Sequence, residues 1–189
     1  MTLIVIIKIL AIIILLLLSA LSSGSETALT AVSKQRAHRQ KDKGAKNANF
    51  ILKIKEFKDE FITGILLANN LFNILATALM TELLVSEFGG LGVSVATIFM
   101  TLMIVIFSEV TPKIFAINKP MTFALKVSKF FYFYTKLIKP IVNLINKVSN
   151  KIIKLIGLNL NADQSKIIEE EFEGAVQLQK QYSKDGEYE

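Results

Sequence analysis

Long apolar blocks separated by strongly charged stretches constrain the fold of this chain more than any other feature. Of the 189 residues, 52% are hydrophobic, and they gather into three blocks instead of spreading evenly. A bilayer core about 30 Å thick is crossed by a helix of about 20 apolar residues. We therefore predict an all-α membrane protein with three spanning helices, at about residues 2–22, 61–86 and 91–109.

The first block can also be read as a secretory signal peptide, because Lys8 precedes an apolar run that ends in small residues. Two features favour a retained helix. Apolar residues precede Lys8 too, so the stretch from Leu3 to Leu21 is long enough to span a bilayer. The segment from Ser33 to Asp59 is also rich in lysine and arginine, and such loops stay in the cytoplasm.

The basic residues also predict the orientation of the spans. The connection between the second and third blocks, EFGGLG, has no Lys or Arg and contains three glycines, which is typical of a tight turn. Lysines return after the third block. By the positive-inside rule, the N-terminus and the glycine turn lie outside, and the basic loop and C-terminal part lie in the cytoplasm.

Residues 119–157 combine aromatic and apolar residues with recurrent lysines. A span would hold Lys126, Lys129 and Lys136 in hydrocarbon, at about 2.5–3.5 kcal/mol for each charge near the centre. We therefore predict amphipathic juxtamembrane helices whose lysines face anionic lipid headgroups. A fourth span at about 121–145 remains the alternative.

Two prolines and a change of composition divide this C-terminal part further. Pro120 and Pro140 are expected to start or break the juxtamembrane helices. Residues 158–189 are acidic and are expected to form a solvated cytoplasmic tail. The domain prediction is thus a membrane domain over 1–157 followed by that tail.

The composition lacks most of the catalytic side chains that hydrolytic enzymes use. The chain has no cysteine and a single histidine, His38, inside a run of basic residues. Cysteine nucleophiles and thiolate metal sites are therefore excluded, and an imidazole zinc site within one chain is excluded as well. We predict that the chain is not an enzyme.

The net charge of the chain, +6, comes largely from lysines beside apolar segments, which favours lipid headgroups over nucleic acid as partners.

Polar residues interrupt the apolar blocks in three clusters, SSGSETAL at 22–29, LLANNLFNI at 66–74 and SEVTPK at 108–113. Polar groups inside a membrane are functional candidates by default. Asn69 and Asn73 share a helical face, and Pro112 is expected to free the carbonyl oxygen of Ser108. One carboxylate with amide, hydroxyl and carbonyl oxygens suits Mg²⁺, Ca²⁺ or Na⁺. The alternative is structural: asparagines that join helices, and a Glu109 that pairs with Lys113.

In this order and spacing, the three clusters resemble the transmembrane domain of the CNNM/CorC family, magnesium transporters whose bacterial members are often labelled magnesium/cobalt efflux or hemolysin-like proteins. The resemblance implies a homodimer in the plasma membrane (the inner membrane in bacteria), with three spans per chain and a largely dehydrated Mg²⁺ bound between them. It also implies efflux of Mg²⁺ or Co²⁺, with Na⁺ as the coupling ion. By motif, the implied metal site comprises Ser23, Gly24, Asn69, Asn73, Ser108 and Glu109.

The chain departs from the family pattern in several ways. Ala68 and Ser108 stand where the family usually has glycine, and both are small enough to preserve close helix packing. No segment within the 189 residues corresponds to the pair of CBS nucleotide-binding domains into which family members normally continue. Two other functions stay open: a non-transporting dimeric scaffold or regulator of ion transport, and a membrane-damaging hemolysin.

Overall fold

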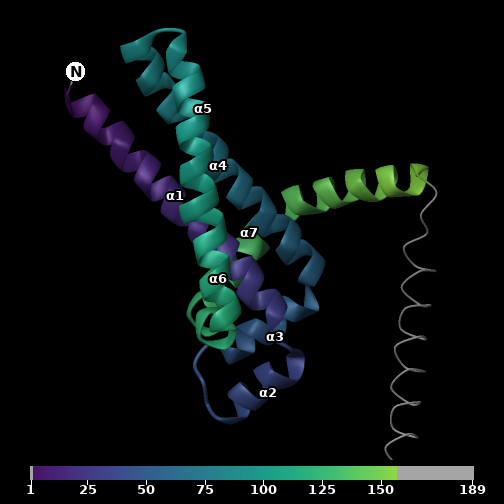
Figure 1. The fold of residues 1–189 in the computed structure, drawn as a ribbon. Coiled ribbons are helices and arrows are strands. Elements are labelled where there is room, and N and C mark those ends of the chain that lie inside the picture. Colours follow the sequence, from purple (N-terminus) through teal and green to yellow (C-terminus); the bar gives the residue numbers. More distant parts are fainter. Residues whose placement is uncertain (1, 157–189) are drawn as a thin grey trace, which may run out of the picture. The chain divides into compact units, whose positions relative to one another are not determined.

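The computed structural model describes residues 2–156, and every element in that range is a helix (Figure 1). The elements are α1 (Thr2–Ala31), α2 (Lys34–Asp42), α3 (Ala48–Glu56), α4 (Lys58–Phe88), α5 (Leu91–Met103), the π-helix η1 (Ile104–Val110), α6 (Thr111–Asn118) and α7 (Pro120–Leu155). Contacts divide the chain into two compact units, residues 1–144 and 145–189. All interactions described below lie in the first unit.

Three helical segments in the described range are long and apolar enough to span a membrane: Leu3–Ala31, Lys58–Phe88 and Leu91–Asn118. This confirms the predicted fold class. The helices nevertheless run well past the predicted ends of the first and third spans, and α1 continues beyond residue 22 through the polar cluster. The reason is local, because the hydroxyls of Ser22 and Ser25 donate to the carbonyls of Leu18 and Leu21, one turn earlier in α1.

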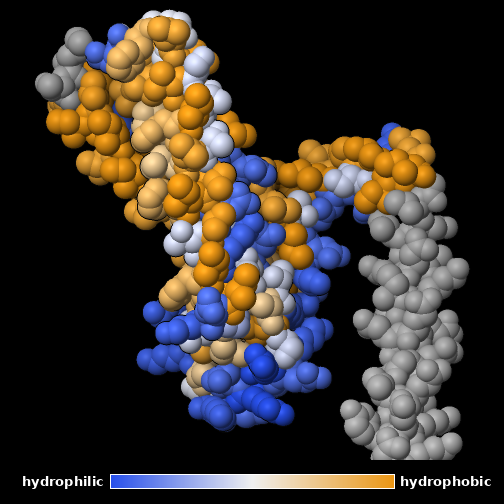
Figure 2. All heavy atoms as spheres, viewed as in Figure 1, coloured by the Kyte–Doolittle hydropathy of each residue, from blue (hydrophilic) through white to orange (hydrophobic). Residues whose placement is uncertain are grey.

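The spanning helices are held together by α1, which packs against α4, η1 and α6, while α5 packs against α4. A small apolar cluster of Ile12, Ala76 and Met100 fills the space where α1, α4 and α5 meet. Most large apolar side chains of these helices point outward. Figure 2 shows an almost continuous apolar surface over α1 and α5, with polar side chains gathered around α2 and α3. Such a surface is expected where lipid, not water, surrounds the protein.

The basic segment after the first span is more ordered than the predicted loop. Ser33 caps α2 by accepting a hydrogen bond from the Arg36 backbone N–H at 3.3 Å. In α3, the side chains of Ile51 and Ile54 are buried in a second core, which also contains Leu29, Phe61 and Phe131. The segment therefore folds because its few apolar residues have a core to enter.

Pro120 begins α7, as predicted, but the helix continues through Pro140 to Leu155. The expectation of a break at Pro140 is therefore wrong. The helix is anchored on both sides of the proline, since Ile138 lies against Gly64 of α4 and Val142 is fully buried. Packing on α4 compensates for the backbone donor that proline removes. The candidate spans among the described residues do not include α7, and the choice between a juxtamembrane helix and a fourth span at 121–145 stays a prediction. The predicted tail at 158–189 lies outside the described residues.

Candidate functional site

The inward face of α1 carries a row of buried serines. Ser19, Ser22, Ser23 and Ser25 are each no more than 2% exposed. Serine is mostly exposed in folded proteins, and a buried hydroxyl needs a partner. Ser22 and Ser25 find theirs within α1, as described above. Ser19 instead faces a neighbouring helix, and Ser23 has no partner among the described residues. These two serines define the site.

Two hydrogen bonds join the second and third predicted clusters to α1, at residues that precede the first cluster. The Ser19 hydroxyl donates to Oδ1 of Asn69 on α4 at 2.6 Å, and the Ser108 hydroxyl of η1 donates to the carbonyl oxygen of Leu16 at 3.0 Å. Ser108 is 1% exposed. Residues that are far apart in the sequence thus meet around the middle of α1. Asn70, by contrast, is exposed and belongs to another face of α4.

Two buried oxygen atoms in this region have no hydrogen-bond partner among the described residues. They are Oγ of Ser23, on α1, and Oδ1 of Asn73, on α4. An unsatisfied buried polar group costs about 1–3 kcal/mol. Native structures rarely leave such groups without a reason, and an absent ion or water is one of the common reasons. Both residues belong to the predicted site.

Glu109 makes the contact that the structural alternative required. Its Oε1 lies 2.9 Å from Nζ of Lys113, one helical turn later, and its side chain is 45% exposed. The carboxylate of Glu26 on α1 lies within electrostatic range of both residues. The structure therefore places two carboxylates and one ammonium group at the junction of α1, η1 and α6.

Gly24 allows α1 to approach α6 and α7 closely. A Cβ atom added there would lie 2.8 Å from the ring of Phe123 and 3.3 Å from the carbonyl oxygen of Pro112. The first distance is shorter than real Cβ contacts allow. Gly24 therefore acts on the site through packing: it lets the Pro112 backbone come near the serine row.

The π-helix η1 carries Ser108 and Glu109 and ends immediately before Thr111 and Pro112. At its end, the Thr111 N–H bonds to the carbonyl of Ile106, five residues earlier. Proline has no N–H to continue the regular pattern, and π-helical turns are found frequently at functional sites. The helix next to Pro112 is therefore irregular, as a wider π-helical turn and not as a break, while the freed carbonyl oxygen of Ser108 stays a prediction.

The chemistry of the site is that of oxygen ligands. Hydroxyl oxygens of Ser23 and Ser108 and amide oxygens of Asn69 and Asn73 lie on packed helices, and Glu109 follows Ser108 in η1. Within residues 2–156, no cluster of three or more histidine, aspartate or glutamate side chains is close enough to hold a metal ion. A cation here would therefore meet mostly neutral, hard oxygen atoms, a donor set suited to Mg²⁺, Ca²⁺ or Na⁺.

The sequence reasoning missed two features. Ser19 is one helical turn before Ser23, and that spacing could have placed it on the same face. Lys8 and Glu82 form an ion pair with Nζ and Oε1 2.7 Å apart, joining α1 to α4. The pair could have been predicted, because one predicted span contains a single lysine, another contains a single acidic residue, and charges inside membranes tend to pair with each other.

Comparisons with known proteins agree with the resemblance seen in the motifs. The profile of the cyclin M transmembrane N-terminal domain (CNNM) matches residues 10–188. The chain is 33% identical over 152 residues to a UPF0053 protein of Haemophilus influenzae, covering 80% of this chain and 36% of that protein. It is 31% identical over 134 residues to the UPF0053 inner membrane protein YfjD of Escherichia coli, covering 71% of this chain and 31% of YfjD.

A putative DUF21 domain-containing chloroplast protein of Arabidopsis thaliana is also 31% identical over 134 residues, which are 71% of this chain and 20% of that protein. The chain thus spans about a third or less of the length of the curated relatives that it matches. The match to the domain profile covers nearly the whole chain. The chain belongs to the CNNM family, whose transmembrane N-terminal domain it matches.

Proposed function

We propose that this chain binds a largely dehydrated Mg²⁺ between α1, α4 and η1, and that it works as a magnesium transporter. The observation that carries the proposal is the buried Oγ of Ser23, which has no hydrogen-bond partner among the described residues. Oδ1 of Asn73 is also buried without a partner there, and it lies on the other side of the Ser19–Asn69 hydrogen bond because α1 and α4 are antiparallel. Membership of the CNNM family supports a role in metal transport. Efflux, coupling to a Na⁺ gradient, transport of Co²⁺ and assembly as a homodimer in the plasma membrane are further parts of the proposal.

Mg²⁺ gives up its water reluctantly and requires nearly octahedral oxygen coordination. The site must therefore supply several oxygens together. Ser23 and Asn73 have unengaged acceptor oxygens. Asn69 accepts one hydrogen bond from the described part of the chain, that of Ser19, and its carbonyl oxygen keeps a second lone pair. Ser108 uses its hydroxyl as a donor, which leaves its oxygen lone pairs available to a cation.

Glu109 has a different role in the proposal, because it can supply negative charge. In the structure that charge is shared with Lys113 at 2.9 Å. A cation that binds Glu109 must compete with the ammonium group of Lys113. Binding and release of the ion are therefore linked to the ion pair between Glu109 and Lys113. In a low-dielectric site the carboxylate offsets part of the dehydration free energy, which neutral ligands do poorly.

The test compares Glu109→Gln with Lys113→Gln. Mg²⁺ affinity is measured by calorimetry on detergent-solubilised protein, and transport is measured as Mg²⁺ flux in proteoliposomes with and without a Na⁺ gradient. Glu109→Gln should weaken Mg²⁺ binding by at least about tenfold, since it removes a ligand charge but keeps the side-chain shape. Lys113→Gln breaks the same ion pair but leaves the carboxylate, so it should retain Mg²⁺ binding.

The outcomes separate the two readings of Glu109. Equal losses of protein stability in both variants, with unchanged Mg²⁺ affinity, would show that Glu109 only joins neighbouring turns of one helix. A wild-type protein that binds no Mg²⁺ and supports no flux would favour the scaffold or regulator of ion transport. Ser23→Ala serves as a second probe of the ligand set. It should weaken Mg²⁺ binding and, because it removes an unpaired hydroxyl, should not destabilise the ion-free protein.

A further inference from the structure

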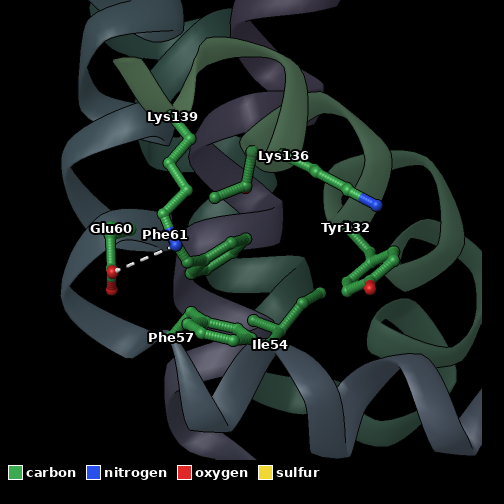
Figure 3. Close-up of a pocket in the computed structure, with 8 residues that line it drawn as sticks. Ile54, Phe57, Glu60, Phe61, Tyr132, Lys136 and Lys139 are labelled. Carbon is green, nitrogen blue, oxygen red and sulfur yellow. Dashed lines mark ion pairs between the residues drawn. The ribbon is translucent and has the colours of Figure 1, made fainter. Parts of the chain in front are cut away.

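A pocket separate from the serine row opens between α3, the first turn of α4, and α7. Its volume is about 170 Å³. Figure 3 shows the side chains that surround it. An apolar cavity of about 150 Å³ is known to hold a benzene-sized molecule. The pocket therefore has room for a short apolar segment, and most of any larger ligand would remain outside it.

The walls of the pocket are mainly apolar. Ile54 and Phe61 are buried at 4% and 1% exposure, and Phe57 and Tyr132 line the pocket beside them. Thr135 also lines it, but its hydroxyl already donates to the carbonyl of Phe131 at 2.8 Å. The interior thus offers van der Waals contact and few hydrogen-bonding groups, which suits a hydrocarbon chain.

The rim of the pocket is positively charged. Nζ of Lys139 lies 4.9 Å from the centre of the Phe57 ring and 4.0 Å from a carboxylate oxygen of Glu60. Lys136 lines the pocket on the side of Tyr132 (Figure 3), and no ion pair of Lys136 occurs within residues 2–156. Lys53 does not line the pocket, but its ammonium group lies 5.4 Å from the centre of the ring of Tyr132, which does. The long Lys139–Glu60 contact neutralises only part of this charge.

The pocket also lies at the end of a spanning helix. Glu60 and Phe61 are in the first turn of α4, the helix Lys58–Phe88 that is a candidate membrane span. The end of a membrane span is the level of the lipid headgroups. An apolar cavity with a cationic rim at that level is complementary to an anionic amphiphile: an acyl chain inside the cavity and a phosphate against the lysines.

We propose that this pocket is a specific site for one anionic phospholipid. The cavity takes a segment of one acyl chain against Ile54 and Phe61, and Lys136 and Lys139 bind the headgroup phosphate. A lipid held there would join α7 to the first turn of α4. This proposal is independent of the Mg²⁺ site, because the two sites share no residue.

The test is native mass spectrometry of the detergent-solubilised chain, titrated with dioleoyl phosphatidylglycerol or with phosphatidylcholine of the same acyl chains. The wild type should bind one phosphatidylglycerol in preference to phosphatidylcholine. Lys136→Gln/Lys139→Gln should weaken that first binding event about 30-fold, since each lysine near an anionic headgroup contributes about fivefold. Lys147→Gln/Lys151→Gln is the matched control, because it removes equal charge from exposed positions of the same helix.

A second variant tests the cavity without altering charge. Thr135→Leu adds apolar volume to the pocket wall and should lower the affinity for phosphatidylglycerol while every lysine stays in place. Equal losses in the two double-lysine variants would overturn the proposal, because they would show diffuse attraction only. Equal affinity for the two lipids would overturn headgroup recognition. Displacement of the lipid by inorganic phosphate at similar concentration would show that the site binds a free anion and not a lipid.

Discussion

The hydroxyl of Ser19 donates a 2.6 Å hydrogen bond to the amide oxygen of Asn69, and this bond joins the spanning helices α1 and α4. Interhelical hydrogen bonds in membranes contribute about 0.6 kcal/mol on average and at most about 1.7 kcal/mol. We expect a coupling energy in this range from a double-mutant cycle of Ser19→Ala and Asn69→Ala. The measurement is unfolding in mixed micelles, for the single and double variants.

Ser22→Ala provides the control for that cycle. Ser22 is as deeply buried as Ser19, but its hydroxyl donates to Leu18 within α1. It should therefore show no coupling with Asn69→Ala. Coupling of equal size in both cycles would mean that the cycle reports general loosening of α1 against α4 and not the hydrogen bond.

The ion pair between Lys8 and Glu82 should stabilise the packing of α1 on α4. The Lys8 side chain is 24% exposed, and the two charged atoms lie 2.7 Å apart. Glu82→Gln leaves Lys8 without its partner in an apolar segment, so we expect destabilisation of about 1–3 kcal/mol. Lys8→Met/Glu82→Leu removes both charges and should recover most of that loss. Unfolding of the three proteins in mixed micelles tests this. A double variant that is no more stable than Glu82→Gln would show that the loss does not come from an unpaired Lys8.

Two glycines at the start of α5, Gly90 before the helix and Gly92 in its first turn, should differ sharply in their tolerance of alanine. A Cβ atom on Gly92 would lie 2.4 Å from the backbone carbonyl of Leu84, whereas nothing lies within 4 Å of one on Gly90. Gly92→Ala should force α5 away from α4 and lower the free energy of unfolding by about 1–3 kcal/mol or more. Gly90→Ala should be nearly neutral. Thermal denaturation in detergent measures both, and equal melting temperatures would contradict the packing argument.

The orientation of the chain is predicted from charge alone and can be tested with reporters. A reporter inserted at Gly90 should be external, because that turn has no Lys or Arg and its surroundings are open enough to accept an insertion. A reporter fused after Glu189 should be cytoplasmic. Accessibility of each reporter to a membrane-impermeant reagent gives the answer. A cytoplasmic reporter at Gly90 would reverse the predicted topology.

Apolar block length was enough to predict the all-α class and the three spans, because the bilayer imposes a nearly fixed helix length on any chain that crosses it. The boundaries were less predictable. Hydropathy places the end of the first span near residue 22, yet α1 continues to Ala31 because Ser22 and Ser25 satisfy their hydroxyls within the helix. Likewise, Pro140 signals a break by its own chemistry, but packing around Gly64 and Val142 keeps α7 continuous.

The residue types of the candidate site could be read from the sequence, because clustered Ser, Asn and Glu inside apolar blocks need a reason to be there. Which of their atoms are engaged was decided only by the tertiary structure. Ser23 and Asn73 are left unpaired, while Glu109 is shared with Lys113. Sequence spacing fixes which side chains share a helical face, but it carries no information on which helix that face meets. The register of α1 against α4, which pairs Ser19 with Asn69 and Lys8 with Glu82, depends on packing between residues far apart in the chain.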